Sequence, residues 1–370
     1  MVKSFLIKKK RRLEDFLREN RTYAMPLILL VGFILDNITL RQIDRVFDNV
    51  VLLTHVLIVA VTIALLLSRE TRFGKRFNID GRRSTISALM LFSFGGLFSG
   101  FVVFYSRSGS LISSWPFILV MILLMIGTEV QKKYYENFIL QITIFYIAVF
   151  SYLIFSVPIV VKKMGPEIYL LSGVISIIFI VFYIFLLKKI HKLKIKKNIK
   201  KIFGRVFIVF LTFNFLYFTN IIPPIPLSLK FSSVYHDFSR IQGVEYRGFY
   251  EPSDKFIFWK KRSNTFNRFK NESVFVYSQI YAPVNLNIDI YHKWEYFDRN
   301  KTRWVTTDEV KIPITGGRLD GYRGFSKKTN ISEGFWRVRI TTDRNQTIGQ
   351  VSFKVIDSEI KPVLVQEIFK

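Results

Sequence analysis

The chain has no cysteine, only four histidines, and 27 acidic residues against 54 basic ones. Without cysteine there can be no disulfide, iron–sulfur cluster, cysteine zinc site or cysteine nucleophile. The histidines stand at positions 55, 191, 236 and 292, and none has the His-x-x-x-His or Glu-x-x-His spacing of a helical metal site. The sequence also lacks a Ser-His-Asp order and a phosphate-binding glycine loop. It therefore favours a non-enzymatic protein and predicts no cofactor and no bound metal.

Hydrophobic residues, by contrast, make up half of the chain, and 38 of the 370 residues are phenylalanine. A helix needs about 20 apolar residues to cross a bilayer core. Residues 23–222 contain seven runs of suitable composition and predict a transmembrane bundle of seven helices, which follows a basic, amphipathic cytoplasmic segment at residues 1–22. The runs are 23–40, 49–67, 85–105, 115–130, 138–161, 168–187 and 203–222.

The basic residues of this half lie mainly in alternate loops. One set of loops, the N-terminus included, carries 25 Lys and Arg, and the other set carries five. Basic loops stay in the cytoplasm, so the sequence predicts an inner-membrane protein with a cytoplasmic N-terminus and a C-terminal domain in the periplasm or outside the cell. Anionic lipid of the inner leaflet is the expected partner of the basic segments, including residues 188–201. Because anchoring explains this charge, no nucleic-acid partner is expected.

Four polar residues near one end of the first two runs form a candidate intramembrane site. Asp36 and His55 are expected at similar depth, with Arg41 and Asp44 just above them. Ionisable side chains within a membrane are costly and often functional, and a carboxylate beside an imidazole could carry a proton. The alternative is a polar cap that fixes the helical hairpin through salt bridges.

Residues 223–370 have the pattern of a β domain. Three prolines within 223–243 predict a stiff linker after the last helix. From 244 to 370, eight short runs alternate with period two, which predicts an antiparallel β-sandwich of immunoglobulin-like form. Trp294, Trp304 and Trp336 are expected in its core. The predicted strands are 244–250, 255–259, 273–281, 286–296, 303–310, 322–326, 335–341 and 347–356.

A glycine-rich stretch at residues 316–326 is the candidate ligand-binding edge of this domain. Its glycines permit close backbone approach, and Arg318 and Arg323 carry forked donors for a carboxylate or phosphate. Tyr322, Lys327 and the more distant His292 complete the candidate set. Two alternatives stay open, in which the arginines brace neighbouring carboxylates in a bulged connection and His292 is a paired core residue.

Several short motifs together resemble the bacterial domain-of-unknown-function family 2914. In the C-terminal half they are NIIPPIPL at 220–227, IYHKW at 290–294, GGR at 316–318, GYRGF at 321–325, GFWRV at 334–338 and residues 348–355. The hairpin DNITLRQIDRVFDN at 36–49 is similar to the multi-span region that accompanies this family. The resemblance implies a bacterial membrane protein with a β-rich C-terminal domain, and it implies no activity or catalytic residue.

Together these features predict a membrane protein that presents a β-sandwich to an envelope ligand, either a glycan, a lipid headgroup or a protein. The alternative is a transporter or membrane enzyme with its site in the bundle, near Asp36 and His55.

Overall fold

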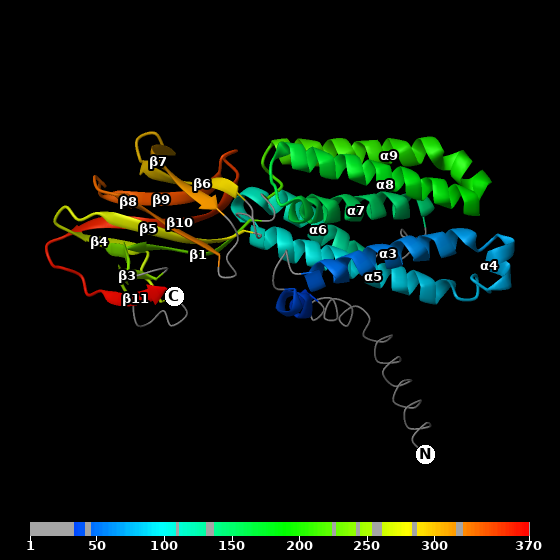
Figure 1. Cartoon of the computed structure of the whole chain (residues 1–370), viewed down its shortest axis with the longest axis horizontal. Coiled ribbons are helices and arrows are strands. Elements are labelled where there is room, and N and C mark those ends of the chain that lie inside the picture. Colours follow the sequence, from blue (N-terminus) through cyan, green and yellow to red (C-terminus); the bar gives the residue numbers. More distant parts are fainter. Residues whose placement is uncertain are drawn as a thin grey trace, which may run out of the picture. The chain divides into compact units, whose positions relative to one another are not determined.

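The computed structural model describes residues 33–40, 46–108, 111–130, 137–223, 227–241, 245–253, 261–282, 287–315 and 321–369. The chain divides into two units (Figure 1). The first comprises Met1–Phe104, Pro116–Ser156 and Leu170–Phe215, and its labelled elements are all helices. The second comprises Tyr105–Trp115, Val157–Tyr169 and Leu216–Lys370, and it contains all the labelled strands.

Five helices within the described residues are long and apolar enough to cross a membrane. They confirm that this is a multi-pass membrane protein. The shorter apolar segment Ser114–Gly127 lies within a further helix, α6 (Leu111–Val130), whose second turn contains Pro116. The five long helices are α3 (Val46–Ser68), α5 (Arg83–Ser108), α7 (Phe138–Val161), α8 (Pro166–Ile190) and α9 (Lys192–Phe218).

The count of seven spans stays a prediction. Of the first predicted span, 23–40, the structure describes only residues 33–40, and 33–39 are helical. The basic stretch 188–201, expected to lie flat on the inner leaflet, instead ends α8 and forms the first turns of α9, with a break at His191. At 1.5 Å per residue α9 is about 40 Å long, so it is longer than a bilayer core of about 30 Å.

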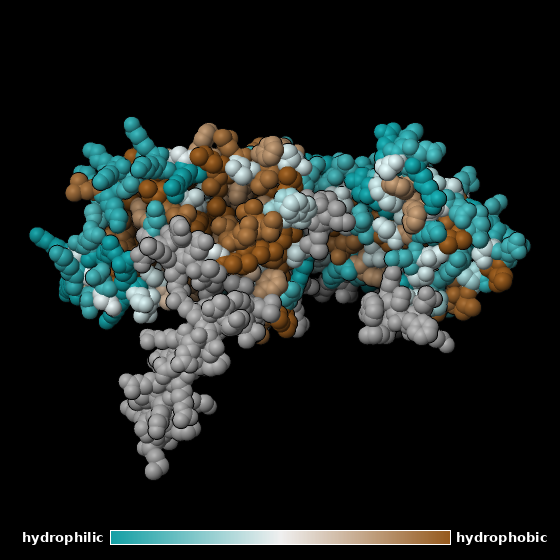
Figure 2. All heavy atoms as spheres, turned by 180° about the vertical axis from the view of Figure 1, so that it is seen from behind, coloured by the Kyte–Doolittle hydropathy of each residue, from teal (hydrophilic) through white to brown (hydrophobic). Residues whose placement is uncertain are grey.

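Phenylalanine rings fill the interior of the first unit. On α5 the side chains of Phe94, Phe98 and Phe101 are completely buried. Phe101 meets Phe155 of α7 edge to face, with ring centroids 5.8 Å apart, and Phe150 stacks on Phe213 of α9 at 4.9 Å. Such geometries suit the quadrupoles of aromatic rings. Figure 2 shows that hydrophobic side chains also cover much of the outer surface of the helices, as expected for contact with lipid.

The described strands form three sheets. The largest has the order β4-β10-β9-β6-β7, the second β1-β5-β8, and the third β11-β3-β2. Every pair is antiparallel except β4 and β10, which run parallel. The strands are β1 (Ser228–Tyr235), β2 (Asp237–Arg240), β3 (Tyr246–Tyr250), β4 (Thr265–Phe269), β5 (Val274–Tyr281), β6 (Asn287–Asp298), β7 (Arg303–Thr315), β8 (Tyr322–Lys328), β9 (Gly334–Thr342), β10 (Thr347–Ser358) and β11 (Val365–Phe369).

Two layers of buried side chains result, because both faces of the sheet β1-β5-β8 are covered. One face packs on the five-stranded sheet through aliphatic residues, two tryptophans and two phenylalanines, Phe266 and Phe353, and we call this layer the inner core. Trp294 and Trp336 are buried there, as predicted. The other face packs on the sheet β11-β3-β2 through aromatic rings alone, which we call the aromatic layer. Its members are Phe231, Tyr235, Phe238, Tyr246, Tyr250, Phe275, Tyr277 and Phe369.

The third sheet explains why the observed domain differs from the two-sheet sandwich that was predicted. Strands β1 and β2 lie in 228–240, within the range expected to be a linker, and β11 is formed by the C-terminal residues. Gly248 of β3 permits the close approach of the aromatic layer, since a Cβ atom there would lie 2.6 Å from the Tyr235 ring. Trp304 also differs from its predicted core position, because it is half-buried and meets Phe297 edge to face, with ring centroids 5.2 Å apart.

Candidate functional site

Strand β8 carries the described part of the candidate ligand-binding edge, and its pleat divides the predicted residues. Arg323 and Lys327 point to the face that holds the aromatic layer, opposite Gln279 and Phe275 of β5. Tyr322 lies on the other face and packs half-buried against the inner core. Arg318 lies outside the described residues. The structure therefore brings Arg323 and Lys327 to one face and separates Tyr322 from them.

Phe325 stands between the two cations on the same face of β8, and it was not among the predicted site residues. Its side chain is 36% exposed, and its ring centroid lies 5.2 Å from that of Phe238. The Nζ atom of Lys327 lies 5.5 Å from the ring centroid of Phe275. The alternation Arg323, Phe325, Lys327 could have been found from the period of two in the sequence. We call these three residues the β8 edge.

Tyr277 of β5 lies next to the β8 edge and provides a buried hydroxyl group. The residue is fully buried, and its Oη atom has no hydrogen-bond partner among the described residues. Burial raises the pKa of Tyr277, and the positive charge of Arg323 opposes this shift. An unpaired buried hydroxyl costs stability, and its complete burial keeps an external ligand from reaching it in this structure.

The chain approaches the β8 edge through Gly321. This residue has a φ of +88°, which favours glycine, and it is buried. A Cβ atom there would lie 2.9 Å from the carbonyl oxygen of Ile280. The glycine therefore lets β8 begin in close contact with the end of β5, which fixes the position of Arg323 two residues later.

His292, the other predicted site residue, belongs to the inner core. Its Nε2 atom lies 2.7 Å from the hydroxyl of Ser278, and its Nδ1 atom lies 2.9 Å from that of Ser326. Trp294 donates from Nε1 to the same Ser326 hydroxyl at 3.0 Å. Complete burial lowers the pKa of His292 to about 3. Both ring nitrogens are thus used to join two sheets, and an external ligand reaches neither.

A charged cluster around His236 was missed in the sequence. The Nδ1 atom lies 2.5 Å from Glu272 Oε1, and Nε2 lies 2.7 Å from Glu251 Oε1. The imidazole also stacks on Phe266, with ring centroids 3.9 Å apart. Burial raises the pKa of Glu251, but hydrogen bonds from His236 and Asn267 outweigh burial and lower this pKa below its usual value. The two glutamates are 36 and 15 positions from His236, so no local pattern could have revealed the cluster. It ties the junction of β1 and β2 to the segments that follow β3 and β4.

A second charged cluster lies on the outer face of the five-stranded sheet. Glu295 is 3% exposed and accepts hydrogen bonds from Arg337 Nε at 2.5 Å and from Arg339 Nε at 3.0 Å. Burial raises the pKa of Glu295, but the two arginines outweigh burial and lower this pKa below its usual value. The guanidinium of Arg337 also lies 4.3 Å from the ring centroid of Trp304. Since its charges are internally paired, this cluster braces the sheet.

In the first unit, the structure brings Asp36 and His55 close enough to interact electrostatically. The Ser99 hydroxyl donates to Asp36 Oδ2 at 2.5 Å. Gly96, one turn earlier on α5, makes room for the imidazole, because a Cβ atom there would lie 3.1 Å from His55 Nε2. The Nδ1 atom of His55 is buried without a hydrogen-bond partner among the described residues. Arg41 and Asp44 lie outside the described residues.

The apolar helices and the sheets define a multi-pass membrane protein with a β-rich C-terminal domain. Within that domain, residues 287–355 match the family "Protein of unknown function (DUF2914)". This match confirms the predicted resemblance for the strands β6 to β10, which include the β8 edge and His292.

Solved structures add two distant likenesses. An immunoglobulin-like protein from Pseudomonas aeruginosa is 11% identical, covers 34% of this chain and 97% of its own, and has a TM-score of 0.20. The alkylpurine DNA glycosylase AlkC from Pseudomonas fluorescens, bound to DNA containing an abasic site analogue, is 7% identical. That match covers 85% of this chain and 100% of the glycosylase, with a TM-score of 0.23. Neither TM-score indicates a shared fold. No curated protein matches the chain.

Proposed function

We propose that the β-rich domain is a non-enzymatic binding module and that its β8 edge binds anionic groups of an envelope glycan, uronate or phosphate. One observation carries the proposal. Arg323, Phe325 and Lys327 alternate on one face of a strand that pairs only with β5 among the described strands. Two cations therefore flank a partly exposed aromatic ring.

Each member of the β8 edge has a chemical role in this proposal. The planar guanidinium of Arg323 can donate two parallel hydrogen bonds to a carboxylate or phosphate. Lys327 adds a flexible point charge, and Phe325 offers an apolar surface to the carbon face of a sugar ring. The Tyr277 hydroxyl is fully buried and unpaired among the described residues, so it would gain a partner only if the ligand displaces Phe325, the β8 residue that pairs with Tyr277.

The module would act outside the cytoplasm. The excess of Lys and Arg in one set of loops, 25 against five, supports a cytoplasmic N-terminus. With seven spans, the β domain then lies in the periplasm or outside the cell. A fluorescent reporter that matures only in the cytoplasm should stay dark when it is fused after Lys370, and a bright fusion would contradict this topology.

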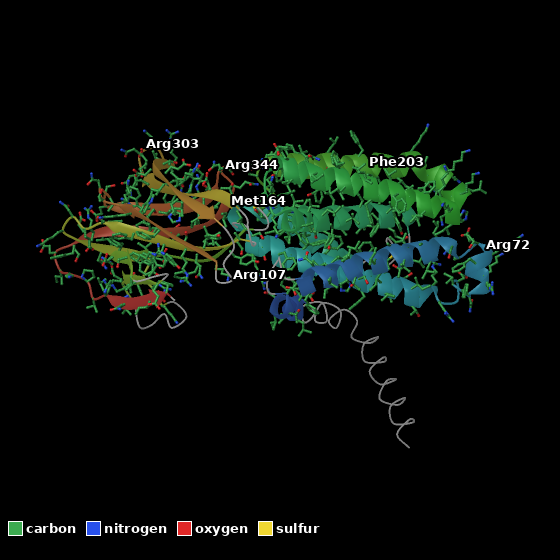
Figure 3. All side chains as sticks on the ribbon, viewed as in Figure 1. Arg72, Arg107, Met164, Phe203, Arg303 and Arg344 are labelled. Carbon is green, nitrogen blue, oxygen red and sulfur yellow. The ribbon has the colours of Figure 1, made fainter. Side chains whose placement is uncertain are left out.

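Binding to defined polymers tests the proposal. The full chain in nanodiscs should bind oligogalacturonate or polyglycerol phosphate and should not bind neutral maltooligosaccharides. Arg323→Lys keeps the charge and removes the fork, so binding should weaken about tenfold, which is roughly one charge-assisted hydrogen bond. Arg303→Lys is the matched control, because Arg303 is an exposed arginine at the start of another strand, β7 (Figure 3).

Three outcomes would count against the β8 edge. Equal binding by wild type and an Arg323→Ala/Lys327→Ala variant would exclude it as the site. Equal weakening by Arg303→Lys would indicate a general effect of charge. A fall in thermal stability without any loss of binding per folded molecule would mean that Arg323 braces the fold.

A second candidate function is proton or ion handling in the helical unit. It is favoured by the convergence of Asp36, Ser99 and His55 among apolar helices. Proteoliposomes of the full chain would then show a proton flux that Asp36→Asn abolishes. The same flux in both proteins would assign the cluster a structural role, in which it joins the helices.

A further inference from the structure

A cavity of about 510 Å³ lies where α3 and α8 change from apolar to basic sequence. Its volume falls within the range of small-molecule sites. Five of its nine lining residues are apolar, and they come from three helices of the helical unit. Those side chains are Val61, Ala64 and Leu65 of α3, Phe73 of α4 (Arg72–Arg76) and Ile190 of α8.

The rest of the lining consists of two hydroxyl residues, Ser68 and Thr71, and two cations, Arg72 and Lys189. No acidic side chain is present among the described residues that form it. The Nζ atom of Lys189 lies 5.0 Å from the ring centroid of Phe185, whose side chain is 52% exposed on α8. The ammonium group therefore stays beside the lipid-facing surface of the helix. Figure 3 labels Arg72 next to α4, at the end of the helical unit.

The surroundings of the cavity are also positive. A more polar cavity of about 240 Å³ adjoins the same end of α3 and is lined by Arg69, Arg83 and Lys194. Lys194, and to a lesser degree Arg69, hold the pKa of the exposed Glu70 below its usual value. Glu70 thus offsets only part of the positive charge at this end of the unit.

The wall of the larger cavity is held in place by a contact between α3 and α8. The hydroxyl of Tyr183 donates to the backbone carbonyl of Ala60 at 2.7 Å. Ala60 directly precedes Val61 of the lining, and Tyr183 lies about two turns before Lys189. The distance between the two helices is therefore fixed close to the cavity, which indicates a preformed site.

We propose that this cavity binds an anionic phospholipid of the surrounding bilayer. One acyl chain would lie on the apolar wall, and the phosphate would meet Arg72 and Lys189. The charge selects the headgroup, since basic pockets between membrane helices suit anionic headgroups. The apolar wall distinguishes a lipid from free phosphate, which would leave that wall in contact with water.

Lipid retention by the full chain tests the proposal. The purified protein is incubated with equal amounts of phosphatidylglycerol and phosphatidylcholine that have identical acyl chains, and native mass spectrometry counts the lipids retained. Phosphatidylglycerol should be retained preferentially. Arg72→Ala and Lys189→Ala should each weaken its binding about fivefold, and the double variant about 25-fold. Lys196→Ala and Lys200→Ala are the matched controls, because these lysines of α9 do not line the cavity.

A second arm tests the acyl-chain position. Ala64→Phe fills the cavity and keeps both cations, so it should also reduce phosphatidylglycerol retention, and millimolar inorganic phosphate should not compete. Equal retention of the two lipids would overturn the proposal. So would equal losses in the α9 controls, or competition by phosphate, which would indicate a phosphate site without a lipid chain. Thermal melts identify any variant that fails to fold, and the surface variants Arg72→Ala and Lys189→Ala test the proposal without any change to the packed wall.

Discussion

The two buried layers of the β domain differ in the charge and hydrogen bonding of their polar groups. In the inner core, His292, Ser278 and Ser326 form a neutral network in which both ring nitrogens are paired. The aromatic layer, by contrast, contains an ion pair and, among the described residues, an unpaired hydroxyl. There Arg262 forms an ion pair with Glu367, and its guanidinium lies 4.6 Å from the ring centroid of Phe231. The hydroxyl of Tyr277 has no partner among the described residues.

Strand β5 shows the difference between neighbouring residues, since Ser278 faces the inner core and Tyr277 faces the aromatic layer. A network whose polar atoms are paired, such as that of His292, contributes to the stability of the domain. A layer with a buried, unsatisfied hydroxyl gives up stability. The comparison therefore assigns folding chiefly to the inner core, and the recognition proposed above would fall to the aromatic layer.

The largest difference should appear when an aromatic residue of each region is truncated. Trp294→Ala should lower the free energy of unfolding by about 3–5 kcal/mol, because it opens a cavity in the inner core and removes the hydrogen bond to Ser326. Phe325→Ala, on the exposed β8 edge, should cost less than about 1 kcal/mol. Denaturation of the full chain, followed by tryptophan fluorescence, measures both. Similar losses would contradict the division between the two layers.

The inner core should also make the domain sensitive to mild acid. His292 has a pKa of about 3 when folded, against about 6.5 when unfolded. Since the unfolded state binds the proton more readily, stability should be unaffected above pH 6.5 and should fall as the pH drops from 6.5 toward 3. At pH 5 the loss is about 2 kcal/mol.

The control for this acid effect is His292→Asn, which has no group that titrates in that range. Its unfolding free energy should be nearly constant between pH 6.5 and 5. Glu251 and Glu295 have lowered pKa values in the folded state, so the stability that their carboxylates contribute is lost only as the pH falls below the pKa of an unfolded carboxyl group. That loss therefore occurs at lower pH than the loss from His292. An equal slope in the variant would assign the acid sensitivity to another group.

The sequence predicted elements with a regular period and missed those without one. The long apolar runs 138–161 and 168–187 correspond to α7 and α8, and the alternation at 347–356 corresponds to β10. Strand β1 was missed because Ser232 and Ser233 interrupt its alternation and a bulge between Leu229 and Phe231 shifts its register. The short strands β2 and β11 carry too few residues to show a period.

The candidate site was predicted in part for the same reason. Arg323 and Lys327 were found through their residue types, and Tyr322 was grouped with them although a period of two places it on the opposite face. Tyr277 could not be found, because its contribution depends on a third sheet that covers β5. Trp304 was expected in the core from its size alone, whereas the Arg337 guanidinium holds it on the outer face of β7.

Within the aromatic layer, Arg262 should contribute less to the free energy of unfolding than Trp294 does, and no more than is lost through His292 in acid. Arg262→Ala removes the ion pair with Glu367 and the cation–π contacts with Phe231 and Tyr250. Both partners of the ion pair are partly exposed, so we expect a loss of about 1–2 kcal/mol. The part due to the ion pair should shrink at high salt. Urea titrations at low and high ionic strength measure both components, and a loss above 3 kcal/mol would mean that this layer also determines folding.

The smallest effect on stability should come from Tyr277→Phe, and it separates the two roles most clearly. The substitution removes a buried hydroxyl that has no partner among the described residues, so stability should stay constant or rise by up to about 1 kcal/mol. If the hydroxyl meets the ligand, binding of oligogalacturonate should nevertheless weaken. Tyr235→Phe is the matched control in the same layer, because the Tyr235 hydroxyl donates to Glu367 Oε2 at 3.2 Å. The control should lose about 1 kcal/mol of stability and keep its binding. Unchanged binding in Tyr277→Phe, together with unchanged stability, would exclude Tyr277 from the site and leave Arg323, Phe325 and Lys327 as the whole of the recognition surface.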